Sequence, residues 1–328
     1  MSDDSWSMVE EAVFRVFAEL AESGTGHVVA GPRLAELGWS EIEAEYPVAA
    51  CELLFRAQGR SLAQTDCLDR VMLAELVARL DAPVDAVVLP ELSAGDAPTS
   101  GDGVVCGIVA GPAHGRLVVP VPGALGTMSL AVVDADRLVS ARLDTFDPSV
   151  HWTRVKGELN GDLFEATAEW NRAVGAAHRA VATELIALAD EALRIAVRHC
   201  SVRVQFGSPI GSFQAPRHLL ADAAASLEGA RALVAGSWGY GGQFSGQEAK
   251  ATAGRAHRKV CSAAQQVCGA IGVSMEHDLH RYVARGFQID ALLGSYQFLE
   301  AVITERLFDT YKPGQPLPTS WRSGDLGM

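Results

Sequence analysis

The second half of the chain contains a long segment with helical patterning and no proline. Residues 163–200, LFEATAEWNRAVGAAHRAVATELIALADEALRIAVRHC, are alanine-rich and amphipathic, and comparable segments follow at about 215–236, 246–271 and 288–308. Long amphipathic helices joined by short turns bury their apolar stripes by packing side by side. The sequence therefore predicts an up-and-down four-helix bundle over residues 158–328.

The remainder of the chain predicts two further regions. Residues 1–83 show apolar residues at spacings of three and four, which favour helices, and a helical block at about 40–80 is expected to break at Gly59. Residues 84–157 hold short β-branched runs, such as GVVCGIVAG, separated by Gly, Pro and Asp. The expected fold is mainly α with a small β-domain between an N-terminal helical domain and the bundle.

Composition excludes several classes of protein. The formal net charge is -13, and the chain has no extended run of Lys and Arg, so the electrostatic footprint of a nucleic-acid-binding protein is missing. The six cysteines are scattered, without a CxxC pair or a His/Cys spacing typical of metal ligands, which predicts reduced thiols and no metal site. The acidic N-terminus and the lack of a long apolar run predict a cytoplasmic protein without a membrane span.

A specific motif, RVQFGSPIGSFQAPRHLLAD at 203–222, lies between the first two predicted bundle helices. A second motif, AQQVCGAIGVSMEHDLHRYVAR at 264–285, contains a Gln-x-x-Gly-x-x-Gly pattern followed by Glu276. Together they resemble the acyl-CoA dehydrogenase family, flavoenzymes that desaturate CoA thioesters. The first motif matches the family at Arg203, Phe206, Gly207, Pro209, Ile210, Phe213, Gln214, His218, Leu220, Ala221 and Asp222.

The resemblance implies FAD as cofactor. In the family, the ADP half of FAD is held by a different subunit from the one that holds the isoalloxazine ring, so a dimer or a dimer of dimers is implied. An arginine can bind the pyrophosphate bidentately, and glutamine side chains and backbone amides can satisfy its remaining oxygens. The cofactor-binding residues implied are Arg203, Phe206, Gln214, Gln266, Val267, Cys268, Gly269, Ala270, Ser295 and Gln297.

The catalytic base of the family has no counterpart at its usual position. Desaturation requires a base that removes the α-proton while a hydride leaves the β-carbon for the flavin. In the family this base is a glutamate before Gly-Thr or Gly-Ser. That position is Leu293 here, although Gly294 and Ser295 fit the pattern around it.

A minority of family members carry the base on the first bundle helix, at a point near Ala177, which is also not an acid. The remaining candidates are Glu184, less than two turns away, and Asp290, which is better interpreted as a solvated helix acid. In the predicted β-domain, LPELSAGDAPTSGDG keeps only a faint trace of the Thr-Glu-Pro stretch that contacts the flavin ring in the family, and the family's Trp-x-Thr stretch has no match.

The interpretation that follows is a subunit of a heteromeric acyl-CoA dehydrogenase, in which a homologous partner supplies the thioester pocket and the base. It resembles the shortened subunits of actinobacterial α2β2 enzymes that oxidise CoA-activated side chains of steroids such as cholesterol. The implied partners are that subunit, an acyl-CoA substrate and an electron-transfer acceptor. Two alternatives remain: a self-sufficient homomeric dehydrogenase that uses Glu184 or Asp290, and a flavin-free scaffold or binding protein.

Overall fold

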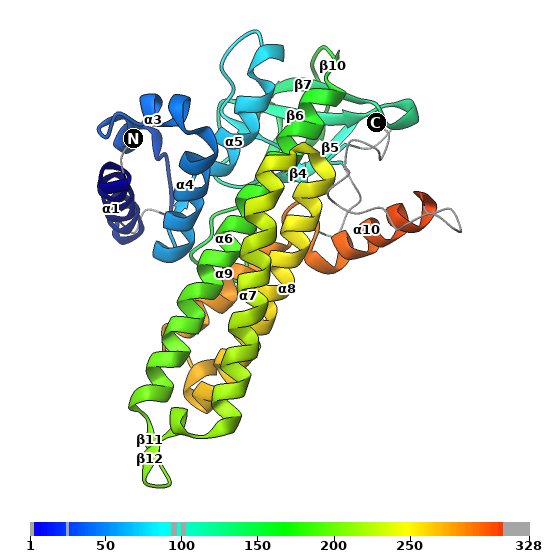
Figure 1. Ribbon diagram of the computed structural model, residues 1–328. Coiled ribbons are helices and arrows are strands. Elements are labelled where there is room, and N and C mark those ends of the chain that lie inside the picture. The colour runs from blue at the N-terminus through cyan, green and yellow to red at the C-terminus, as the bar shows by residue number, and fades with distance from the viewer. Residues whose placement is uncertain (1–2, 24–25, 93–96, 100–102, 311–328) are drawn as a thin grey trace.

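A computed structural model describes residues 3–23, 26–92, 97–99 and 103–310. It confirms a mainly α fold in which a small β-domain lies between N-terminal helices and a long helical bundle (Figure 1). The helices are α1 (Asp3–Glu22), α2 (Gly31–Ala35), α3 (Trp39–Glu45), α4 (Pro47–Ser61), α5 (Cys67–Leu76), α6 (Thr167–Val202), α7 (Gln214–Tyr240), α8 (Gly242–Cys268), α9 (Leu279–Asp290) and α10 (Tyr296–Thr310).

The expected break at Gly59 is wrong, because α4 continues through this residue to Ser61. A Cβ atom at position 59 would lie 2.8 Å from the carbonyl oxygen of Glu184 and 2.9 Å from the Cβ of Ala187, both on α6. Gly59 therefore allows α4 and α6 to pack closely. The helix is terminated after Ser61 by Leu62, whose φ of 60° is left-handed.

The β-domain consists of two four-stranded sheets, in the orders β10-β7-β6-β3 and β4-β5-β9-β8. The pairing of β10 with β7 extends the domain past residue 157. A short pair, β1 (His27–Val28) and β2 (Gln64–Thr65), lies in the N-terminal region. The strands of the β-domain are β3 (Ala86–Val87), β4 (Leu89–Pro90), β5 (Val104–Val109), β6 (Arg116–Pro122), β7 (Met128–Asp134), β8 (Val139–Arg142), β9 (Thr153–Glu158) and β10 (Phe164–Glu165).

Alternation along the strands divides the apolar side chains between two cores. Leu117 and Val119 of β6 pack in a separate cluster with Val105 and Val133, whereas Val118 joins the main core with the helices. Successive side chains of a strand point to opposite faces of a sheet. One face of the β6 sheet therefore belongs to the β-domain itself, and the other attaches the domain to the helices.

The bundle departs from the expected pattern in its fourth helix. The segment at 288–308 is not one helix, because α9 ends at Asp290 and α10 begins at Tyr296. Leu293 and Gly294 between them have φ values of 54° and 93°. An α-helix cannot continue through left-handed residues. In Figure 1, α10 consequently runs outward from the bundle axis.

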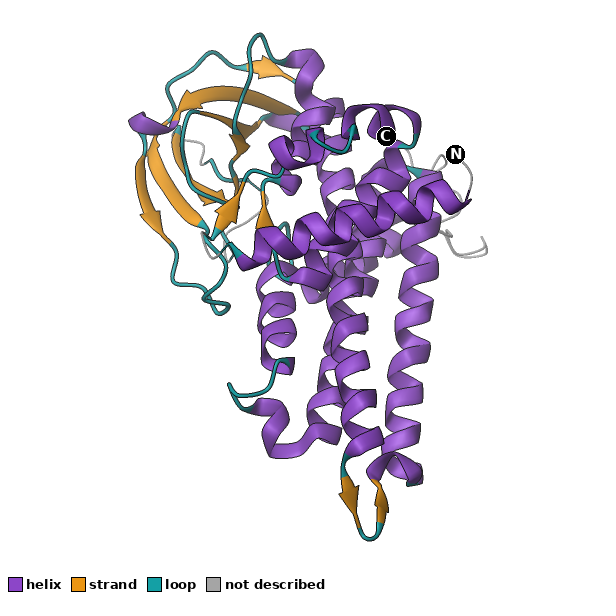
Figure 2. Ribbon diagram, turned by 90° about the vertical axis from the view of Figure 1, so that its left-hand side faces the viewer, coloured by secondary structure: helices purple, strands orange, loops and turns teal. Residues whose placement is uncertain are grey.

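At the far end of the bundle from the β-domain, α6 and α7 are joined by a small hairpin of β11 (Val204–Gln205) and β12 (Ser208–Pro209). Figures 1 and 2 both show this hairpin projecting beyond the helices. All six cysteines are free thiols, and four of them are buried. Across the described ranges, no helix combines the length and apolar character needed to cross a membrane.

Candidate functional site

A cavity of about 530 Å³ lies where the β-domain meets the bundle. Its walls come from β4 and the residues after it, from the start of α6, from the start of α8, and from the 291–295 loop together with α10. This volume is within the range of small-molecule and cofactor sites. The lining includes Pro90, Glu91, Leu92, Met128, Trp170, Asn171, His178, Gln243, Gln247, Leu293, Gly294, Ser295 and Phe298.

The 291–295 loop, which carries Leu293, is held by a buried lysine. Lys250 of α8 has no exposed surface, and its Nζ donates to the carbonyl oxygens of Asp290 (2.8 Å) and Gly294. Its Nζ also lies 3.8 Å from Oδ1 of Asp290. Burial lowers the pKa of Lys250 to about 8, and the carboxylate of Asp290 opposes that shift. Lys250 thus ties both ends of the loop to the bundle.

His178 of α6 holds the middle of the same loop. Its Nε2 lies 3.0 Å from the carbonyl oxygen of Leu293. Because a carbonyl only accepts, Nε2 carries the proton and Nδ1 offers a lone pair, for which the described residues provide no hydrogen-bond partner. Burial, assisted by the charge of Lys250, lowers the pKa of His178 to about 3, so the ring is neutral.

Asp290, one of the two candidate bases, does not line the main cavity. Its carboxylate accepts the N–H of Tyr296 (3.2 and 3.3 Å) at the start of α10 and faces Lys250. Burial raises the pKa of Asp290. Together with Gln297, it lines a separate cavity of about 180 Å³. The interpretation as a solvated helix acid is therefore wrong, since the carboxylate forms part of the α9–α10 junction.

Glu184, the other candidate base, is enclosed between α4, α6 and α9. Its Oε2 accepts from Nε2 of Gln58 (2.7 Å), and its Oε1 lies 3.9 Å from Nη1 of Arg285. Burial raises the pKa of Glu184 to about 7, although Arg285 and Gln58 act in the opposite direction. It lines a cavity of only about 30 Å³. Neither candidate base therefore faces the main cavity.

The one acid among the described residues lining the main cavity is Glu91, and it is already paired. Its Oε1 lies 2.5 Å from Nε of Arg154 on β9. This ion pair engages the carboxylate of Glu91 with the guanidinium of Arg154. At the position of the family's usual base, the loop presents the isobutyl group of Leu293 to the cavity.

The predicted cofactor residues fall into two groups at opposite ends of the bundle. Ser295 lines the main cavity, and Gln297 lines the neighbouring one. Arg203 directly follows the end of α6, Gln214 begins α7 and Gln266 is exposed on the last turn of α8. Gly269 and Ala270 accompany Gln266 at the surface, whereas Val267 is half-buried against the main core and Cys268 is 6% exposed.

The hairpin presents an aromatic side chain at its tip. Phe206 and Gly207 have φ values of 53° and 80°, as the two central residues of a type I′ turn require. Phe206 is 94% exposed, and its ring meets that of Phe213 edge-on with centroids 6.2 Å apart, a separation typical of aromatic pairs. A bulky side chain in the left-handed region is strained, and this one is largely exposed to solvent. We call Arg203, Phe206, Gln214 and residues 266–270 the distal surface.

The residues present fit the two halves of a dinucleotide such as FAD. The main cavity offers largely apolar walls with a few polar groups and the paired acid Glu91. A Cβ at Gly269 of the distal surface would meet nothing within 4 Å, so the backbone is open to a ligand there. From His178 to Arg203, α6 spans roughly 37 Å at the usual helical rise. This distance exceeds the length of an extended FAD molecule, so one cofactor cannot contact both places on one chain.

Sequence patterns did not reveal Lys250 and His178 as the residues that hold the loop. For Lys250 a signal existed: Gly246, Lys250, Ala253 and His257 recur at the spacing of one helix face, which places a lysine on a buried stripe. For His178 the sequence offered a weaker signal. The adjacent Ala177 is near the family's second base position, which indicated this part of α6 as a site region but not that His178 holds the loop.

Comparisons with known proteins identify relatives of this chain. Residues 172–308 match the family model described as "Acyl-CoA dehydrogenase, C-terminal domain". The acyl-CoA dehydrogenase IpdE2 of Mycobacterium tuberculosis is 30% identical over 259 residues, which cover 77% of this chain and 74% of that protein. The acyl-CoA dehydrogenase FadE34 of the same organism is 32% identical over 207 residues, which cover 60% of this chain and 28% of FadE34.

Two solved structures share the fold. A steroid ACAD, Tcur3481-Tcur3483, has a TM-score of 0.71 at 23% identity, with 92% of this chain and 97% of that chain covered. The ChsE4-ChsE5 complex from Mycobacterium tuberculosis has a TM-score of 0.65 at 21% identity, with 90% and 88% covered. The IpdE2 match, together with the family-model match, shows that the chain belongs to the acyl-CoA dehydrogenase family.

Proposed function

We propose that this chain is the subunit of a heteromeric, FAD-dependent acyl-CoA dehydrogenase that lacks the catalytic base. The observation that carries the proposal is the lining of the main cavity, where Leu293 replaces the base and the lining acid, Glu91, is paired with Arg154. The two other candidate acids, Glu184 and Asp290, are bound elsewhere. Removal of the α-proton then requires a carboxylate from a homologous partner.

The contribution of this chain is its distal surface. FAD bound at the shared site would supply the acceptor for the hydride that leaves the β-carbon of the thioester. Arg203 would meet the negative charge of the pyrophosphate, and Gln214 and Gln266 would donate to its remaining oxygens. These three side chains are exposed around the hairpin, and their placement supports a site that two chains complete together.

The substrate class we propose is a CoA thioester with a bulky acyl group, of the steroid side-chain type. The support is the likeness to heteromeric structures, one of which is a steroid ACAD. An α2β2 heterotetramer fits the distal surface, because each copy of this chain would complete the cofactor site of one partner. An electron-transfer acceptor must then reoxidise the flavin.

The test is the change Arg203→Ala in the chain co-expressed with its homologous partner. Loss of a charge-assisted contact of about 1.5–3 kcal/mol should weaken FAD binding roughly tenfold or more. Bound flavin is measured by absorbance after size-exclusion chromatography, and FAD affinity is measured by titration of the stripped complex. Arg142→Ala serves as control, since Arg142 is exposed on β8 in the β-domain.

The proposal is overturned if Arg203→Ala and Arg142→Ala bind FAD equally well. It is also overturned if the chain purified alone retains flavin and turns over an acyl-CoA, because that result would establish a homomeric enzyme. A complex that contains no flavin in either form would instead support the scaffold alternative.

A further inference from the structure

The end of the bundle that carries the distal surface also brings together three side chains that are typical metal ligands. His199 lies on the last turn of α6, Cys268 is the last residue of α8, and His277 precedes α9. One ligand atom from each lies within 4.8 Å of the other two. Among the described residues, no other group of three His, Cys, Asp or Glu side chains meets this criterion.

The donor set is that of a zinc site. Zn²⁺ binds imidazole nitrogen at about 2.0–2.1 Å and thiolate sulfur at about 2.3 Å, so tetrahedral ligand atoms lie roughly 3.3–3.6 Å apart. Small rotations of side chains already within 4.8 Å reach that spacing. Thiolate with imidazole favours Zn²⁺ over the hard cations Mg²⁺ and Ca²⁺, which take oxygen ligands.

The surroundings hold these three side chains in place. The two imidazole rings meet edge to face, with centroids 6.2 Å apart and planes at 86°, so they are not stacked on each other. The chain also turns tightly around the thiol, because a Cβ atom at Gly272 would lie 2.6 Å from the Cβ of Cys268. Cys268 is buried while both histidines are half-buried, so an ion here would be reached from solvent on the histidine side.

We propose that His199, Cys268 and His277 bind one Zn²⁺ ion, with water in the fourth position. The ion would join the ends of α6 and α8 to the segment before α9, three pieces of chain that no disulfide connects. Because Cys268 stands within residues 266–270, the ion would also fix the backbone of the distal surface. The proposal depends on the geometry of the isolated chain and not on the proposed enzymatic role.

The experiment uses the full chain, stripped with a chelator and titrated with ZnSO₄ under reducing conditions. The expected result is one equivalent of bound zinc by elemental analysis and isothermal titration calorimetry, and a raised melting temperature. With Co²⁺ instead, the chain should show the intense visible bands of a tetrahedral site and a thiolate-to-cobalt charge-transfer band. Cys268→Ala and His277→Ala should each weaken zinc binding at least tenfold, since each removes a ligand.

Two matched variants make the result specific. His280→Ala removes a nearby imidazole whose Nδ1 contacts the carbonyl oxygen of His277, and Cys200→Ala removes the neighbouring buried thiol. Both should retain one zinc. The proposal is overturned if Cys268→Ala, shown to be folded by circular dichroism, binds zinc as the unmodified chain does. It is also overturned if the cobalt spectrum of the unmodified chain lacks the thiolate-to-cobalt band. The same holds if that band is lost in Cys200→Ala but kept in Cys268→Ala.

Discussion

The carboxyl group of Glu184 is buried among groups that stabilise its charge only in part. Its folded-state pKa is raised from 4.5 to about 7 by burial. Between these values the unfolded chain releases the proton while the folded chain keeps it. The contribution of Glu184 to stability is therefore largest below pH 4.5 and falls as the pH rises to about 7.

We expect Glu184→Gln to flatten the pH dependence of the free energy of unfolding in this window. The slope should decrease by up to about 1.4 kcal/mol per pH unit, the value for one proton. Urea unfolding at a series of pH values measures this slope. Asp69 and Glu248 also have pKa values raised to about 7, so some slope remains. Glu228→Gln on the exposed face of α7 is the control, and equal slopes in both variants would refute the assignment.

At the scale of elements, glycines set how closely helices approach. Gly59 brings α4 against α6, and Gly246 of α8 lies against Gly175 of α6, where a Cβ at position 246 would come within 2.7 Å of a carbonyl oxygen. The second contact adjoins the main cavity, because Gln243 and Gln247 of α8 line it. Close helix packing thus determines how wide the cavity is.

Gly59→Ala should destabilise the chain by about 1–3 kcal/mol, since overpacking outweighs the gain of up to about 1 kcal/mol in helix propensity. Gly229→Ala on α7 is the matched control, because a Cβ there meets nothing within 4 Å. That variant should be stabilised by about 0.5–1 kcal/mol. Thermal and urea unfolding compare them, and a stabilised Gly59→Ala would contradict the packing argument.

The junction of α9 and α10 depends on the amine of Lys250. Lys250→Met preserves most of the volume but leaves the Asp290 and Gly294 carbonyls without this donor, which should cost about 1–3 kcal/mol. Hydrogen exchange should accelerate at the Tyr296 amide, whose acceptor is Asp290. Lys259→Met, on the same helix and 42% exposed, should change stability by less than about 0.5 kcal/mol. Unchanged hydrogen exchange at the Tyr296 amide in Lys250→Met would show that Lys250 is not needed to hold the 291–295 loop.

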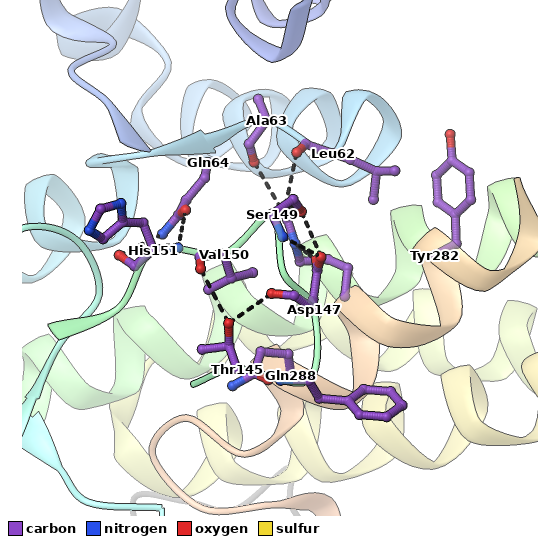
Figure 3. Close-up of polar contacts among 12 residues, drawn as sticks. Leu62, Ala63, Gln64, Thr145, Asp147, Ser149, Val150, His151, Tyr282 and Gln288 are labelled. Atoms are coloured by element: carbon purple, nitrogen blue, oxygen red, sulfur yellow. Dashed lines mark hydrogen bonds and ion pairs between the residues drawn. The ribbon is translucent and has the colours of Figure 1, made fainter. Parts of the chain in front are cut away.

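At the scale of the whole molecule, Arg285 of α9 connects all three regions. It is 2% exposed, and its Nε donates to Oδ2 of Asp147 in the β-domain (2.7 Å). Nη1 and Nη2 donate to the carbonyl oxygens of Ala63 and Leu62 after α4, both at 3.0 Å. Figure 3 shows Asp147 and Ser149 lying beneath these carbonyls.

The same β-domain loop is attached at two more points. The side-chain amide of Gln64 donates to the carbonyl oxygen of His151 (3.1 Å) and accepts from its N–H (2.5 Å), as drawn in Figure 3. Gln288 of α9 accepts the N–H of Phe146 (2.8 Å). These polar contacts complete the interface between the helical regions and the sheets, alongside the apolar core that they share.

Arg285→Lys should destabilise the chain by about 3–5 kcal/mol, because a lysine cannot reproduce the planar fork and leaves buried partners unsatisfied. Arg281→Lys on the same helix is the control; it is exposed and lies 4.0 Å from Asp278, so its effect should be below about 0.5 kcal/mol. Urea denaturation monitored by circular dichroism measures both. Similar stabilities would mean that the network is not needed to join the regions.

The regular helices and strands of this chain could be predicted from its sequence, because local residue patterns specify them. The first helix, the long helices α6 to α8 and the strand-rich middle follow from hydrophobic periodicity, and the motif around Arg203 identified the family. Gly59 and the 288–308 segment were predicted wrongly, because both depend on contacts with distant residues. Gly59 is tolerated inside a helix by its fit against α6, and the α9–α10 break is held by Lys250 and His178.

The sequence by itself determined the family, the order of the regions and the absence of a carboxylate at position 293, since each of these depends on residue identity and spacing. Only the tertiary structure decided which acids face the main cavity, because burial and pairing depend on residues far apart in the chain. It alone also brought His199, Cys268 and His277 together. No sequence spacing reveals a cluster whose members come from the ends of separate helices.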